Sequence, residues 1–148
     1  MSTTSKTPTS LAQTEAAQPL PPGCRVLLAE DSIDNQRLMG FLLNKAGADV
    51  EVVENGARAM DAAQKAIDVG RPFSIILMDM QMPLMDGYTA TRRLRDEGYP
   101  GVIIAITAQA MPGDREKCLT AGCDDYLTKP IDRQLLRAAL DHWITVQT

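Results

Sequence analysis

The sequence has few of the residues that mark several large classes of protein. Its 148 residues include 3 cysteines, 1 histidine and 1 tryptophan, and aromatic residues make up 4% of the chain. An odd number of cysteines without metal-like spacing argues against a disulfide framework or a zinc site. We therefore expect Cys24, Cys118 and Cys123 to be free thiols in or near the core.

Positive charge and long apolar runs are also scarce. Lys and Arg number 15 against 19 Asp and Glu, for a net charge of -4. This balance disfavours a nucleic-acid-binding surface. No apolar run is long enough to cross a bilayer, and the opening segment, MSTTSKTPTS, lacks the apolar core of a secretory signal. We expect a cytoplasmic protein whose folded part contacts neither nucleic acid nor membrane.

The composition divides the chain into two parts. Residues 1–23 are rich in Ser, Thr, Pro, Ala and Gln, contain no aromatic residue, and end in the extended segment around Pro19, Pro21 and Pro22. Such a stretch cannot bury enough apolar surface to offset its ordering entropy, which predicts a disordered tail or linker. One folded domain is predicted over residues 24–146.

Within the predicted domain, short apolar runs alternate with amphipathic stretches. The pattern predicts strands at 26–29, 50–53, 75–78, 102–106 and 125–127, and helices at 35–45, 55–69, 88–95, 114–120 and 131–145. The runs at 75–78 and 102–106 are continuously apolar, which is typical of parallel strands covered on both faces. The run at 50–53 alternates and suits a position nearer the edge. Five strands alternating with five helices predict an α/β fold with a parallel sheet.

Apolar spacing also predicts which helix faces are buried. In the first helix, Leu38, Phe41 and Leu42 recur at helical spacing. In the last helix, a set of five apolar residues is predicted to face inward: Leu135, Leu136, Ala139, Leu140 and Trp143.

Polar residues follow four of the five strands. Glu30 and Asp31 follow the first, Asp79 the third, Thr107 ends the fourth and Lys129 follows the fifth. Because the carboxyl ends of parallel strands lie at one edge of a sheet, we expect these groups to share a small pocket.

Three neighbouring carboxylates repel one another unless a cation binds them. With no histidine or cysteine among them, they suit a hard divalent ion such as Mg²⁺, which leaves coordination sites for phosphate oxygens. A lysine and a hydroxyl beside the ion complete a cradle for a transferring phosphoryl group. Asp79, at the end of a buried strand, is the best candidate for a nucleophile that forms an aspartyl-phosphate.

Each of these residues has a simpler interpretation when taken alone. Asp31, with Ser32, fits a helix cap, and Asp86–Gly87 fits a turn. Lys129 fits a solvated loop and Thr107 an ordinary strand end. Four strand-end matches in one chain favour the functional interpretation.

Two other chemistries fit less well. A haloacid-type phosphatase needs a second acid two residues after the nucleophile, where this chain has Gln81. A nucleotide or flavin binder needs a glycine-rich loop after the first strand, where Glu30 and Asp31 stand instead.

Four segments together resemble the signature segments of response-regulator receiver domains: VLLAEDSIDNQ, IILMDMQMPLMDG, IAITAQA and DDYLTKP. The resemblance covers residues 24–146. It implies the flavodoxin-like (βα)5 three-layer sandwich, with parallel strand order 2-1-3-4-5. It also makes a degenerate receiver that only binds partners less favoured, because Asp79, Thr107 and Lys129 are all present.

The resemblance implies a role for each site residue. Asp79 would be the phosphoacceptor, with Lys129 pairing to the phosphoryl group and Thr107 donating a hydrogen bond to it. Mg²⁺ would be held by Asp31, Asp79 and the main-chain carbonyl of Gln81, with Glu30 acting through water. Tyr126 would be the aromatic switch, and the bond from Lys129 to Pro130 would be cis.

The motif details are most similar to receivers of hybrid histidine kinases, notably through Glu30 and the pair Asn35–Gln36. The implied function is that of a C-terminal hybrid-kinase receiver, with a stand-alone response regulator as the alternative. The implied partner is a histidine kinase or a histidine phosphotransfer domain. We expect this domain to catalyse only its own phosphorylation and dephosphorylation, whereas a full-length parent would be a histidine kinase. The last two helices are the expected output and dimer surface.

Overall fold

The computed structural model describes residues 18–108 and 111–147, so most of the predicted tail lies outside the described residues. The strands are β1 (Arg25–Ala29), β2 (Asp49–Val53), β3 (Ile75–Asp79), β4 (Val102–Thr107) and β5 (Asp125–Thr128). The helices are α2 (Ile33–Lys45), α3 (Gly56–Asp68), α4 (Gly87–Asp96), α5 (Asp114–Ala121) and α6 (Arg133–Gln147). Strands and helices alternate along the described chain as predicted.

The five strands form one parallel sheet in the order β2-β1-β3-β4-β5. This order confirms the flavodoxin-like arrangement and places the alternating strand β2 at an edge. The interior strands β1, β3 and β4 are almost wholly buried, which explains their continuously apolar sequences.

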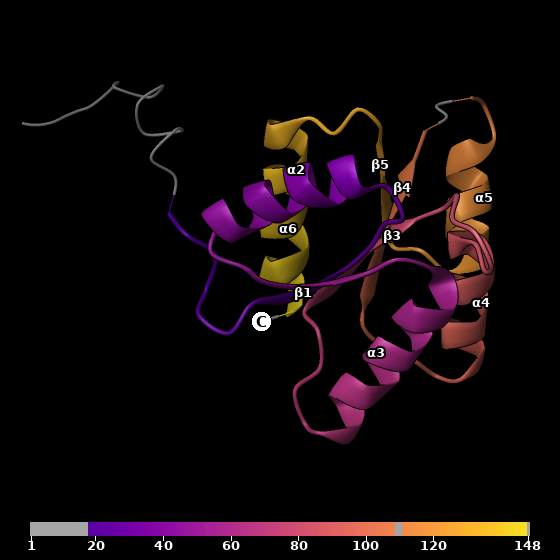
Figure 1. The fold of residues 1–148 in the computed structure, drawn as a ribbon, viewed down its shortest axis with the longest axis horizontal. Helices are drawn as coiled ribbons and strands as arrows, with labels where there is room; N and C mark the ends of the chain where they lie inside the picture. The colour runs from indigo at the N-terminus through magenta and orange to yellow at the C-terminus, as the bar shows by residue number, and fades with distance from the viewer. Residues whose placement is uncertain (1–17, 109–110, 148) are drawn as a thin grey trace, which may run out of the picture.

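Helices cover both faces of the sheet, giving three layers (Figure 1). Successive side chains of a strand point to opposite faces. On β1, Leu27 therefore packs in the cluster that includes α3, α4 and α5, whereas Val26 and Leu28 pack in the cluster that includes α2 and α6. The same alternation on β3 and β4 gives two cores, one on each face of the sheet.

Side-chain caps fix where three helices begin. Ser32, Asn55 and Asp86 each accept a hydrogen bond from a backbone N–H three residues on, at the starts of α2, α3 and α4. Ser32 comes directly after Glu30 and Asp31, and Asp86 ends the loop that follows β3. The caps therefore set how the chain leaves the strands at the edge where the polar residues gather.

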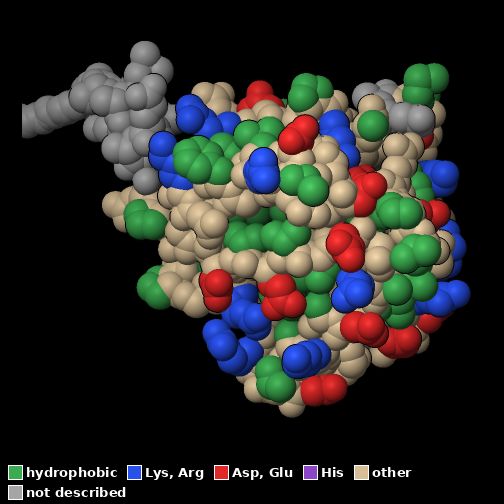
Figure 2. Space-filling model, viewed as in Figure 1, with side chains coloured by type: hydrophobic (Ala, Val, Ile, Leu, Met, Phe, Trp, Pro, Cys, Tyr) green, Lys and Arg blue, Asp and Glu red, His purple; other side chains and the backbone are tan. Residues whose placement is uncertain are grey.

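The buried face of α2 differs from the predicted one. Leu38 and Phe41 are 46% and 61% exposed, and Leu42 is partly buried against the core, whereas Met39 and Leu43 are buried. Figure 2 shows the exposed apolar side chains on the outer face of this helix. Adjacent apolar residues form two helical stripes on α2, and packing into the core on the α2 and α6 face of the sheet buries the stripe of Met39 and Leu43.

Leu135 was also placed wrongly by the sequence pattern, since it is 60% exposed. Leu136, Ala139 and Leu140 are buried and Trp143 is partly buried, at the spacing of one helical stripe. Leu135 lies about 100° around the helix from Leu136, because an α-helix has 3.6 residues per turn. It therefore falls on the solvent side of the first turn of α6.

Packing begins ahead of β1. Leu20 is 5% exposed within the cluster of α2 and α6, and its N–H donates to the carbonyl of Ala46 at 2.7 Å. Arg137 on α6 donates to the carbonyl of Gln18. The segment before Cys24 thus closes the edge of the core between α2 and α6. No helix within the described ranges is long and apolar enough to cross a membrane.

All three cysteines are buried as free thiols, as the sequence predicted. Burial is the main cause that raises the pKa of each thiol, and it raises the pKa of Cys123 to about 12.

We expect none of these thiols to react with an Ellman-type reagent in the folded protein near pH 8, because the thiolate is the reacting form. All three should react after denaturation. The check is absorbance of the released thiolate before and after adding denaturant. Rapid labelling of the native protein would contradict the buried placement.

Candidate functional site

Three carboxylates meet at the carboxyl edge of the sheet. Glu30 and Asp31 follow β1 and Asp79 ends β3, and one oxygen from each lies within 4.8 Å of the others. Glu30 and Asp79 are 0% and 1% exposed, whereas Asp31 is exposed. Ser32, not Asp31, caps α2, so the carboxylate of Asp31 belongs to this acidic cluster.

Lys129 joins the cluster from the end of β5. Its Nζ lies 2.9 Å from Oδ2 of Asp79 and 3.2 Å from Oε1 of Glu30. Its backbone N–H donates to the carbonyl of Thr107 at 2.8 Å, and its bond to Pro130 is cis. The chain after β5 is thus held against the end of β4, which directs the ammonium group to the two buried carboxylates.

Backbone N–H groups donate to one further oxygen of Asp79 and to one of Glu30. Gln81 N donates to Oδ1 of Asp79 at 3.0 Å, and Ser32 N donates to Oε2 of Glu30 at 3.1 Å. Oε1 of Glu30 is buried without a hydrogen bond of acceptable geometry, the one such side-chain oxygen among the residues described.

Burial and neighbouring charge shift the pKa values of two of these groups. Burial, the largest cause, raises the pKa of Glu30, and the negative charge of Asp79 raises it further. Burial would lower the pKa of Lys129, but Asp79 and Glu30 outweigh it and raise that pKa. The pKa of Lys129 is therefore held above its ordinary value, whereas the charge of Lys129 offsets only a small part of the effect of burial on the pKa of Glu30.

The cluster fits a hard divalent cation. Three carboxylates against one ammonium leave an excess of two negative charges. All the side-chain ligand atoms are oxygens, which Mg²⁺ prefers. Oε1 of Glu30, 3.2 Å from Nζ of Lys129, is buried without a hydrogen bond of acceptable geometry and so can accept a further partner. A bound divalent ion would supply the charge that is missing.

The other predicted site residues are Thr107, Gln81 and Tyr126. Thr107 is 2% exposed at the end of β4, one residue beyond the Ile106 that pairs with Asp79. Gln81 lies two residues after Asp79, so its carbonyl is close along the chain. Tyr126 is half-buried on β5 and packs against the cluster that includes α5.

One contact at this edge was not predicted. The side-chain amide of Gln36 on α2 donates to the backbone carbonyl of Glu30 at 2.7 Å. The pair Asn35–Gln36 stands out in the sequence only by its resemblance to hybrid-kinase receivers. A side-chain bond that spans six residues leaves no periodic signal by which to find it.

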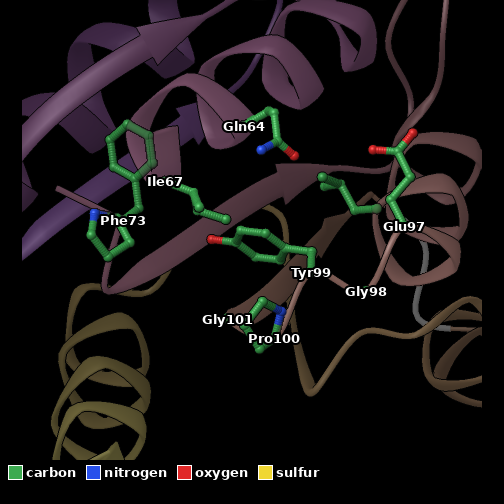
Figure 3. A pocket seen from close by; sticks show the side chains of 10 residues that line it. Gln64, Ile67, Phe73, Glu97, Gly98, Tyr99, Pro100 and Gly101 are labelled. Atoms are coloured by element: carbon green, nitrogen blue, oxygen red, sulfur yellow. The ribbon is translucent and has the colours of Figure 1, made fainter. Parts of the chain in front are cut away.

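A cavity away from the carboxylates lies at the other edge of the sheet. It has a volume of about 600 Å³ and is lined by residues of α3, α4 and the loops before β3 and β4. In Figure 3 the ring of Tyr99 lies across it, with the hydroxyl directed towards Ile67 and Phe73. These loops are at the amino ends of the strands, so the cavity is separate from the carboxylates.

The fold and the acidic edge together define a flavodoxin-like α/β domain with a receiver-type pocket. Residues 26–141 match the family model described as the response regulator receiver domain. The chain therefore belongs to the response regulator receiver domain family, in agreement with the sequence resemblance.

Relatives in this family differ in size. A hybrid signal transduction histidine kinase I of Dictyostelium discoideum is 44% identical over 116 residues, which cover 76% of this chain and 7% of that protein. The chain thus spans a small part of this kinase. The two-component response regulator ORR41 of Oryza sativa subsp. japonica is 38% identical, and the match covers 78% of this chain and 91% of that protein.

Solved receiver structures share the fold. The receiver domain of the sensor histidine kinase PA1611 of Pseudomonas aeruginosa PAO1, which holds a magnesium ion in its active-site cleft, is 41% identical with a TM-score of 0.74. That match covers 83% of this chain and 98% of the other. The co-crystal structure of Saccharomyces cerevisiae Ypd1, a histidine phosphotransfer protein, with the receiver of Ssk1 gives 30% identity, a TM-score of 0.77 and coverages of 86% and 93%.

Proposed function

We propose that this domain accepts a phosphoryl group from a phosphohistidine onto Asp79 in a Mg²⁺-dependent step and changes conformation as a result. The observation that carries the proposal is the convergence of Glu30, Asp31 and Asp79 within 4.8 Å, with Lys129 2.9 Å from Asp79. The proposed receiver unit is residues 24–146, extended by the packed segment at Leu20.

The residues that would hold Mg²⁺ are Asp31, Asp79 and the main-chain carbonyl of Gln81, with Glu30 acting through water. When bound, the ion supplies positive charge beside the phosphate oxygens and keeps the carboxylates ionised. Asp79 is bound by Gln81 N and Lys129 Nζ, so its carboxylate is fixed before the donor arrives.

In the proposed step a carboxylate oxygen of Asp79 attacks the phosphorus of the phosphohistidine. A P–O bond forms, the P–N bond breaks, and the electron pair leaves with the imidazole of the donor. Lys129 stabilises the negative oxygens of the transferring group, and Thr107 donates a hydrogen bond to one of them.

The new phosphoryl group adds charge of about -1.5 to -2 where Asp79 had a single charge. Lys129 and Thr107 move to satisfy its oxygens, and this favours the conformer in which Tyr126 packs inward. The surface of α5, β5 and α6 is then the proposed output face and the proposed site of dimer contact.

The phosphodonor that we propose is a histidine kinase or a histidine phosphotransfer domain in the cytoplasm. The similarity to a hybrid histidine kinase and to a receiver bound to a phosphotransfer protein supports this. We favour the C-terminal receiver of a hybrid kinase. The alternative is a stand-alone response regulator, supported by the relative that this chain matches over 91% of its length.

The direct test is incubation of the protein with Mg²⁺ and acetyl phosphate, followed by intact mass. We expect a mass increase of one phosphoryl group that is absent when EDTA replaces Mg²⁺ and that disappears on treatment with hydroxylamine, which cleaves acyl phosphates. No adduct on the wild-type protein, or an adduct that forms equally in EDTA, would contradict the proposal.

A further inference from the structure

Gln36 is a polar residue on the buried stripe of α2. It lies three and seven residues before Met39 and Leu43, whose side chains are buried in the core beneath the helix. Residues at this spacing share one face of a helix. The side chain of Gln36 is therefore directed to the sheet, at the end of α2 nearest the carboxylates.

The main chain of Glu30 lies just beyond the β-ladders. The last residue of β1 in register with both neighbouring strands is Ala29, which pairs with Val53 and Met78. The N–H of Glu30 still donates to Val53 at 3.0 Å, but its carbonyl has no strand partner in these ladders. Gln36 supplies the donor instead, at 2.7 Å.

This bond acts together with the Ser32 cap on the path of the chain as it leaves β1. The carbonyl of Glu30 belongs to the peptide group that joins Glu30 to Asp31, so fixing that oxygen fixes the plane from which Asp31 departs. Asp31 is exposed, so little packing holds its carboxylate near Asp79. The orientation of the peptide group is then one restraint on the position of Asp31, beside the cap that Ser32 forms on α2.

We propose that Gln36 is a positioning residue for the divalent-metal site, acting on Asp31 through the Glu30 carbonyl. The inference rests on the Mg²⁺ site of the proposed function. Groups that orient metal ligands without touching the metal affect affinity by about 10- to 100-fold when they are replaced.

The test is direct Mg²⁺ binding by titration calorimetry with the full chain. Gln36→Leu removes the donor and fills the same space, which keeps out the water that a smaller residue would admit from the shallow cavity beside Gln36. We expect Kd for Mg²⁺ to rise about 10-fold. The matched control is Gln64→Leu on α3, whose side-chain amide donates to the exposed Asp68 at 3.0 Å, and its Kd should equal that of the wild type.

A second variant separates positioning from charge. Gln36→Glu keeps the length of the side chain but cannot donate at neutral pH, and it brings a negative charge near the metal. A purely electrostatic role predicts tighter Mg²⁺ binding, whereas a positioning role predicts weaker binding. If Gln36 has a positioning role, Gln36→Glu should be labelled by acetyl phosphate more slowly than the wild type at low Mg²⁺, and at the wild-type rate when Mg²⁺ saturates the site.

Unchanged affinity in Gln36→Leu, or tighter binding in Gln36→Glu, overturns the proposal. A loss of thermal stability with unchanged affinity would assign Gln36 a structural role only, and it overturns the proposal too. If the wild-type protein binds Mg²⁺ but accepts no phosphoryl group, the proposed function fails while the affinity comparison still decides the role of Gln36. If the wild type binds no Mg²⁺, both fail.

Discussion

The Asp79→Asn variant is expected to accept no phosphoryl group from acetyl phosphate, while it remains folded. An amide is a far weaker nucleophile than a carboxylate, and Asp79 is the buried carboxylate that ends β3 and contacts Lys129. Asparagine keeps the oxygen that accepts the hydrogen bond from Gln81 N. The change removes one of the two buried negative charges, and Lys129 still has Glu30 as a partner. The fold should therefore tolerate the change.

Two measurements check this expectation. Intact mass after incubation with Mg²⁺ and acetyl phosphate should show the adduct on the wild type and none on Asp79→Asn. Asp61→Asn, an equivalent change at an exposed position on α3, should be labelled like the wild type. A phosphoryl adduct on Asp79→Asn would show that another residue is the acceptor. An unfolded variant, seen by circular dichroism, would show that the carboxylate is needed for stability as well.

Calorimetric titration should also show weaker Mg²⁺ binding by Asp79→Asn. The cluster would keep two carboxylates against Lys129, so its excess negative charge falls from two to one. If the variant still accepts a phosphoryl group but binds Mg²⁺ weakly, Asp79 is a metal ligand and not the acceptor. If it accepts none but binds Mg²⁺ like the wild type, Asp79 is the acceptor and not a metal ligand.

The strand pattern was predictable because burial on both faces of a parallel sheet requires continuous apolar runs in the sequence. Strands covered on both faces are apolar along their buried length, as in β3 and β4 before Asp79 and Thr107, while the edge strand β2 alternates. The chain direction was equally readable, since α-helical stretches between strands imply parallel crossovers. The strand order itself came from resemblance, because nothing in the spacing of the runs tells which strands are neighbours.

Helix faces were less predictable than helices. α2 has apolar residues on two stripes, and its sequence does not say whether Met39 and Leu43 or Leu38 and Phe41 meet the sheet. The same ambiguity displaced Leu135 by one position from the buried stripe of α6. Where apolar residues are adjacent, only the tertiary contacts select the buried face.

The acidic site was predictable for a geometric reason. Its members follow strand ends, and parallel strands bring those ends to one edge whatever the lengths of the intervening helices. The supporting contacts lack such a rule. The bond from Gln36 to Glu30 and the packing of Leu20 on α2 depend on side-chain reach and on the path of a loop. They became visible only with the structure.

The backbone carbonyl of Asp79 is in close contact with Gly87 at the start of α4. A substitution at Gly87 is therefore expected to have the second large effect. A Cβ built on Gly87 would lie 2.3 Å from the carbonyl oxygen of Asp79 and 2.6 Å from Cε of Met80. The nearer atom is backbone, which cannot rotate away as a side chain can. Gly87→Ala must therefore move the start of α4 or the end of β3. We expect a loss of about 1–3 kcal/mol in the free energy of unfolding, the usual cost of overpacking.

Gly40→Ala is the matched control, because a Cβ at Gly40 has nothing within 4 Å and the residue lies inside α2. Alanine is favoured over glycine in a helix interior by about 0.5–1 kcal/mol, so this variant should be more stable than the wild type. Urea unfolding followed by circular dichroism measures both changes. Because the displaced atom in Gly87→Ala belongs to Asp79, labelling by acetyl phosphate should also slow in that variant alone. Equal stability and equal labelling in Gly87→Ala and the wild type would show that α4 is free to shift, and that the acceptor does not depend on the close contact with Gly87.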